Sequence, residues 1–271
     1  MSEALLPAIR ETFRIPFTPH AIERLDDAGG YLEIVWPRVA ASVETAGFLG
    51  SALYMADMAL DAVEAVYEPL LSRDTLRDAG LSAADLANLE AVLDLFHYTQ
   101  PQLLLLLAAL AEAWDRAQVG GHGRPDRRER TERERRHQAL EVRFAPSSMP
   151  PLPEVVAALG VEAPPDLYRA VAMWPRYVEA AWEELQHLGA YPDFRRRGRA
   201  LYFYARSGAR FLAEPLRANP EALREAGMDG AAIAAARAAL DTALPSLATM
   251  MMHVEAMRLG LGLRAREVVA R

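Results

Sequence analysis

Hydrophobic residues recur along this chain at intervals of three and four, the spacing that places side chains on one face of an α-helix. Leu86, Leu89, Val92, Leu93 and Phe96 follow this pattern, and strong helix formers (Ala, Leu, Glu, Arg) fill the positions between such residues. Prolines and glycines fall between the periodic segments, where helices start or stop. The sequence contains no runs of alternating β-branched residues. It therefore predicts an all-α fold.

An internal repeat is the second pattern. Residues 76–81 read LRDAGL, and residues 223–228 read LREAGM, at an offset of 147. The same offset gives nine identities in the nineteen positions of residues 76–94, against roughly two expected from typical residue usage. Three further blocks reappear in the same order at offsets of 146 to 148. Four blocks in one order predict a duplicated helical unit.

The duplication predicts how the chain is divided. We expect a first helical repeat at residues 1–115, an Arg/Glu-rich crossover linker at 116–144 and a second repeat at 145–271. Two related units that form one compact body are expected to pack as a pseudo-dimer about a pseudo-twofold axis. A ligand cavity would then lie between the two repeats.

The crossover linker contains GGHG at residues 120–123 and RRERTERERRHQ at 127–138. We interpret it as a solvated linker with a short helix that is stabilised by Glu129–Arg133 and Glu132–Arg136 pairs. An arm that binds anions or RNA is the alternative, but interleaved glutamates cancel most of the positive field.

Composition narrows the function classes. The 271 residues carry a formal net charge of −7, which argues against a general nucleic-acid partner. The chain has no cysteine and no lysine, so thiolate and lysine chemistry are excluded. The N-terminal segment has no signal-peptide pattern, and the apolar run at 103–111 is too short for a bilayer. We expect a cytoplasmic protein that does not bind membranes; a homodimer is left open.

Two segments place polar groups where a core helix begins. The first, 96–102, reads FHYTQPQ before five leucines, and Pro101 is expected to break or restart the helix. His97 is interpreted either as a core histidine bonded to a carbonyl or as a site histidine that holds a water molecule. The isolated Glu184-x-x-His187 spacing lacks a second copy, so no metal site is expected.

The second segment is Ala163-Pro164-Pro165-Asp166, and its counterpart in the first repeat is Pro16 to Ala21. Asp166 after two prolines suits a helix N-cap. A carboxylate at this place also suits activation of a water molecule. At the offset of the repeat Asp166 matches His20, and His97 matches Leu244, so the two halves differ in their polar residues.

Several stretches together resemble the group I 2-haloacid dehalogenases, the DehI family. They are FRIPF at 13–17, GYL at 30–32, LFHY at 95–98 with Pro101 and the leucine run, and AMWP at 172–175. The resemblance implies an all-helical fold of two related halves around one buried site. It also implies hydrolysis of short 2-halocarboxylic acids without a cofactor or a covalent intermediate, by an Asp that draws a proton from a water held by an Asn.

The resemblance assigns expected roles to particular residues. The position of the water-holding Asn falls on His97, and a gapless match places the catalytic Asp on Leu167. If the match to the family is shifted by one residue, the catalytic Asp corresponds to Asp166. We take Asp166 as the general base and His97 as the residue that positions the water. Phe17, His20, Leu167 and Tyr98 are expected to contact the substrate.

The sequence leaves three functions open. The first is a DehI-like hydrolase that acts on short halogenated acids. The second is a catalytically silent relative that binds a small carboxylic acid or another metabolite in the same cavity. The third is a structural or oligomerising helical module.

Overall fold

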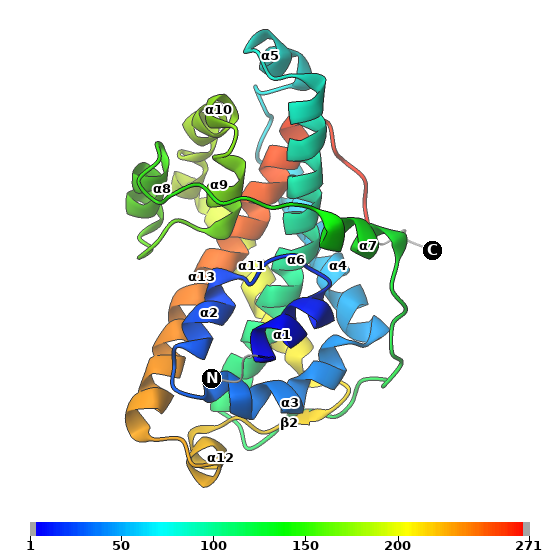
Figure 1. Ribbon diagram of the computed structural model, residues 1–271, viewed down its shortest axis with the longest axis vertical. Helices are drawn as coiled ribbons and strands as arrows, with labels where there is room; N and C mark the ends of the chain where they lie inside the picture. The colour runs from blue at the N-terminus through cyan, green and yellow to red at the C-terminus, as the bar shows by residue number, and fades with distance from the viewer. Residues whose placement is uncertain (1–3, 268–271) are drawn as a thin grey trace.

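The structure is a computed structural model, and it describes residues 4–267. The chain is almost entirely helical, as predicted (Figure 1). The helices before the crossover are α1 Leu5–Phe13, α2 His20–Asp26, α3 Tyr31–Val43, α4 Ala46–Glu64, α5 Arg73–Asp78 and α6 Ala83–Trp114. α7, Glu132–Ala139, lies in the crossover. The helices after it are α8 Leu152–Leu159, α9 Asp166–Val171, α10 Pro175–Leu185, α11 Pro192–Gly208, α12 Pro220–Glu225 and α13 Gly230–Gly260.

The same helix starts recur in the two halves. Ser72 and Asn219 cap α5 and α12, and Ser82 and Asp229 cap α6 and α13. Each of these side chains accepts a hydrogen bond from a backbone N–H in the first turn, which satisfies a donor that the helix leaves free. Both pairs of caps keep the spacing of the sequence repeat. The packing of the halves as a pseudo-dimer stays a prediction.

The two longest helices, α6 and α13, run side by side through the middle of the molecule (Figure 1). The expectation that Pro101 breaks the helix is wrong, because α6 continues through it. The Gln102 side-chain amide donates to the Tyr98 carbonyl at 2.8 Å, which satisfies a backbone acceptor beside the proline. α6 is buried on every side from Leu95 to Ala111, which explains the uninterrupted apolar run at 103–111.

The crossover is exposed over much of its length, but three of its polar side chains are buried against the rest of the protein. The short helix exists as α7, but Arg128, Glu134 and His137 are buried. In place of the expected pair with Glu129, Arg133 pairs with Asp94 of α6 and with Glu267 of the C-terminal segment. Acidic groups on the neighbouring elements offer partners in a drier environment than the surface does, so the linker folds onto them.

Two short strands, β1 Val119–Gly120 and β2 Pro215–Leu216, pair antiparallel and were not predicted. Gly120 has φ +81°, and a side chain there would collide with the Glu214 carbonyl, so glycine suits this position. Within residues 4–267, no helix is both long enough and apolar enough to cross a bilayer.

Candidate active site

A cavity of about 450 Å³ lies between α2, α6, α13 and the segment that leads into α9. Its walls are mainly apolar, with Phe17, Phe96 and Leu103 on one side and Leu247 and Met250 on the other. The Phe17 ring packs 5.6 Å from that of Phe96, centroid to centroid. Volume and apolar lining are typical of a small-molecule site.

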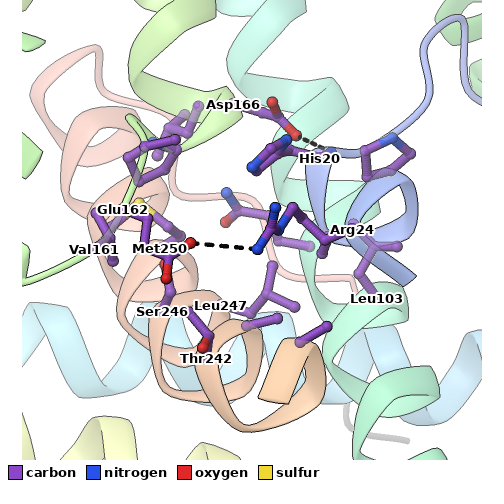
Figure 2. Close-up of a pocket in the computed structure, with 18 of the residues that line it drawn as sticks. His20, Arg24, Leu103, Val161, Glu162, Asp166, Thr242, Ser246, Leu247 and Met250 are labelled. Carbon is purple, nitrogen blue, oxygen red and sulfur yellow. Dashed lines mark hydrogen bonds and ion pairs between the residues drawn. The ribbon is translucent and has the colours of Figure 1, made fainter. Parts of the chain in front are cut away.

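Asp166 lines this cavity, and its carboxylate points toward α2 (Figure 2). Oδ2 accepts a hydrogen bond from the backbone N–H of His20 at 2.8 Å. Among the described residues no donor contacts the other oxygen, Oδ1. Asp166 is the first residue of α9 and Pro165 is the N-cap, so the N-cap interpretation of Asp166 is wrong. Its carboxylate bonds to the other half of the chain instead.

The surroundings of Asp166 favour its protonated form. Burial raises the pKa of this carboxyl above its ordinary value, because protein atoms replace the water that would solvate the charge. The His20 N–H, the His20 ring and Arg169 act in the opposite direction without cancelling this effect. A carboxylate with a raised pKa is a stronger base than an exposed one once it is ionised.

Thr99 and Gln100 bring further polar groups to the cavity from α6. Both side chains are buried, and neither Thr99 Oγ1 nor Gln100 Oε1 has a hydrogen-bond partner within the described part of the protein. Buried polar atoms normally have partners. Because both residues line the cavity, these two atoms are candidates for contact with a water molecule or a ligand.

An ion pair lies at the mouth of the cavity. Arg24 of α2 contacts Glu162 at 3.4 Å across the opening, and both side chains are more than half exposed (Figure 2). His20 also lines the mouth, with its ring Nδ1 3.5 Å from Glu23. The sequence interpretation did not single out Arg24 or Glu162, because a charged residue on a short amphipathic helix is usually a solvated one.

Three of the predicted substrate contacts lie at the cavity. Phe17, His20 and Leu167 line it together with Asp166. Leu167 is fully buried, so it forms part of the apolar wall. Their contact with a substrate stays a prediction.

His97 does not meet Asp166, contrary to the prediction that the two share one cavity. Its ring is completely buried, with Nδ1 2.5 Å from Glu255 of α13 and Nε2 2.9 Å from Glu267. Burial by itself would lower the pKa of His97, but the charge of Glu255 and the hydrogen bonds that both carboxylates accept from the ring outweigh it and raise the pKa. His97 thus belongs to a buried ion cluster that also contains Arg258.

Tyr98 does not line the cavity either. Its hydroxyl donates to Glu134 and accepts from Arg128 Nη1 at 2.7 Å, so it holds the crossover against α6. The expected role of Tyr98 in substrate contact is not supported by this position.

Helix geometry explains which residues of α6 reach the cavity. Phe96, Thr99, Gln100 and Leu103 have the spacing of one helix face, and all four line the cavity. A residue one position along is rotated by about 100°, so His97 points away when Phe96 points in. This spacing was present in the sequence and could have identified Gln100.

No group of three or more His, Asp or Glu side chains suited to a metal ion occurs in residues 4–267. Glu184, which we considered for metal binding, accepts hydrogen bonds from the backbone N–H groups of Leu70 and Leu71 and from the Tyr67 hydroxyl. It joins the loop after α4 to α10.

The fold and this cavity define an almost entirely helical protein with a half-buried carboxylate, that of Asp166, in a mainly apolar small-molecule site. A family model described as "Halocarboxylic acid dehydrogenase DehI" matches residues 19–158, more than half of the chain. The chain belongs to the DehI family. Asp166 lies just beyond the matched residues.

Solved structures share the fold of this chain. The structure of D-2-haloacid dehalogenase with L-LA matches with a TM-score of 0.83 at 18% identity, over 93% of this chain and 89% of that one. A mutant of D-2-haloacid dehalogenase with D-2-CPA gives 0.82 at 18% identity, over 96% and 92%. A comparison with curated protein sequences gives no match.

Proposed function

We propose that this protein hydrolyses the carbon–halogen bond of 2-halocarboxylic acids, with Asp166 as the general base. The observation that carries the proposal is the Asp166 carboxylate, which has a raised pKa and projects into an apolar cavity. Membership of the DehI family and a fold shared with D-2-haloacid dehalogenases support this reaction class.

The proposed reaction is a direct displacement by water. Asp166 Oδ1 takes a proton from a water molecule, the water oxygen forms a bond to C2 of the acid, and the C2–halogen bond breaks as the halide leaves with its electron pair. The products are a 2-hydroxy acid, a halide ion and a proton carried by Asp166. The His20 N–H fixes Oδ2, so the free oxygen keeps one orientation toward the cavity.

Gln100 and Thr99 replace His97 as the residues that hold the water in this proposal. Both have unpartnered polar atoms at the cavity, whereas the two ring nitrogens of His97 are engaged by Glu255 and Glu267. A side-chain amide can both accept from and donate to a water molecule, so Gln100 can supply the contact that the family resemblance assigns to an Asn.

The test is halide release from the separate enantiomers of 2-chloropropionate and 2-bromopropionate. Release is expected from the parent protein and should fall by about a thousandfold in Asp166→Asn, since a general base contributes roughly 10²–10⁴-fold. Asp78→Asn, at an exposed position on α5, is the matched control and should release halide at the parent rate. Absence of halide release from the folded parent over a range of 2-haloacids would contradict the proposal.

A second candidate is a protein that binds a carboxylic acid without turnover. It is favoured by the position of His97, which places the residue expected to hold the water inside an ion cluster. Ligand-induced increases in melting temperature without halide release would identify this function.

A further inference from the structure

The cavity is larger than a three-carbon acid requires. Its volume of about 450 Å³ is in the range that holds drug-sized ligands, and it equals the space of roughly fifteen bulk water molecules. A 2-halopropionate next to Asp166 would leave most of that space to solvent. The size indicates a longer ligand.

The part of the cavity that a three-carbon acid would not fill extends along α13. Small residues on one face of this helix form one wall of the cavity: Ala235, Ala238, Ala239, Ala243 and Ser246. Larger side chains at these positions would fill the cavity. Leu103 and Leu247 also line it, so the wall along α13, which is open to solvent at Ala235 and Ala238, offers mainly apolar surface to a hydrocarbon chain.

Arg24 supplies a cationic group that can bind the carboxylate of such a ligand. Among the described lining residues it is the single arginine, and its guanidinium points toward Glu162 (Figure 2). Its partner Glu162 is 76% exposed and 3.4 Å away. An exposed ion pair of this length is weak, so a ligand carboxylate can take the place of Glu162 on Arg24 and form two parallel hydrogen bonds.

The spacing on α2 connects this anchor to the proposed base. His20, whose N–H holds Asp166, and Arg24 are four residues apart on one face of the helix, about one turn or 5.4 Å along its axis. A carboxylate on Arg24 would thus be held about one helical turn from the residue that holds Asp166. The remainder of the chain can then follow α13.

We propose that the cavity binds unbranched carboxylic acids longer than three carbons, with the carboxylate on Arg24 in place of Glu162 and the chain along the alanine face of α13. The proposal deepens the proposed function by naming its substrate class; it rests on that function for the reaction and not for the binding.

Calorimetric titration of the whole protein with propionate, butyrate, hexanoate and octanoate tests the binding. Affinity should rise with length, by up to about fourfold for each methylene group that becomes fully buried. Ala238→Phe should weaken octanoate binding at least tenfold and leave propionate unchanged. Ala234→Phe, on the same helix but outside the cavity lining, should change neither. An affinity that does not depend on chain length would overturn the proposal.

Charge variants test the anchor. Arg24→Gln should weaken octanoate binding roughly ten- to hundredfold, because it removes charge-assisted hydrogen bonds, and should leave the binding of octanol unchanged. Glu162→Gln should strengthen octanoate binding about two- to fivefold, since it frees Arg24. If the Arg24–Glu162 pair only held the loop in place, Glu162→Gln would not tighten binding. Arg77→Gln, which breaks the exposed pair with Asp74, is the control.

Halide release separates this proposal from the proposed function. With 2-bromooctanoate and 2-bromopropionate as substrates, kcat/KM is expected to be higher for the longer acid. Chain-length-dependent binding without any halide release would contradict the reaction and leave the binding site supported. Halide release with equal kcat/KM for both acids, unchanged in Arg24→Gln, would contradict the binding site and leave the reaction supported.

Discussion

The carboxylate of Asp166 accepts a hydrogen bond from the backbone N–H of His20, and the two residues are 146 positions apart, an offset of the sequence repeat. Residues at equivalent places in the two halves are thus in direct contact at the cavity. In an isologous pair, equivalent residues touch each other only at the symmetry axis. The pseudo-twofold arrangement stays a prediction; if the halves pack in that way, this contact lies beside the axis.

Replacing Asp166 with Asn should increase stability while it removes activity. The fold raises the pKa of Asp166 above the unfolded value, so the ionised carboxylate is destabilising, and stability is lost as the pH rises through the raised pKa. Asn keeps an acceptor for the His20 N–H without the charge. The melting temperature of Asp166→Asn should exceed that of the parent at about pH 8. The difference should disappear below about pH 3, where Asp166 is mostly protonated in both the folded and the unfolded state. A difference that persists in acid would contradict the burial argument.

Gln100→Leu should lower halide release about ten- to hundredfold with little loss of stability. The substitution removes the buried side-chain amide of Gln100, whose carbonyl oxygen has no partner among the described residues. Such a removal is neutral or stabilising by about 1 kcal/mol. Gln102→Leu is the matched control, because Gln102 is buried on the same helix outside the cavity lining and donates to the Tyr98 carbonyl. That variant should lose about 1 kcal/mol of stability and keep the parent rate. Urea denaturation and halide release measure the two effects.

His97→Gln should destabilise the protein by roughly 3 kcal/mol, because it leaves Glu255, Arg258 and Glu267 in a buried cluster without the imidazolium. The raised pKa of His97 means that its contribution is fully present below the ordinary value of 6.5 and is lost as the pH rises through the folded value. The difference in unfolding free energy between parent and variant should therefore shrink in alkaline solution. His122→Gln, at an exposed position, should show neither effect.

Arg128→Met should destabilise the protein by about 3 kcal/mol, since Glu134 would be left buried without its cation. For a chain of this size, such a loss lowers the melting temperature by roughly 6–12 °C. Arg127→Met changes the neighbouring residue, whose side chain is 75% exposed in its pair with Glu44, and should cost less than about 1 kcal/mol. Equal effects of the two variants in thermal unfolding would show that the crossover is not held by the buried pair.

The fold was predictable because it depends on patterns that extend over many residues. Three- and four-residue spacing predicted the helices, and the offset of 147 identified the duplicated segment in which, in the structure, Ser82 and Asp229 begin α6 and α13. The two-residue strands and the passage of α6 through Pro101 depend on single tertiary contacts, which leave no periodic signal.

The site was predictable only in part. Asp166, Phe17, His20 and Leu167 lie at the cavity, whereas His97 and Tyr98 lie on the opposite face of α6. A match to a motif assigns a position along the chain but not a direction around a helix, and one residue of displacement rotates a side chain by about 100°. Arg24 and Glu162 meet from segments far apart in the sequence, so their pairing needed the structure.

The contacts of the crossover with both halves bear on how many chains make one functional unit. Arg128 bonds to the Thr12 carbonyl in the first half, and Arg133 bonds to Glu267 at the end of the second half. A duplicated protein risks domain swapping, in which the first half of one molecule pairs with the second half of another. A connector that is anchored to both halves of its own chain opposes that exchange, so each polypeptide should close its own cavity.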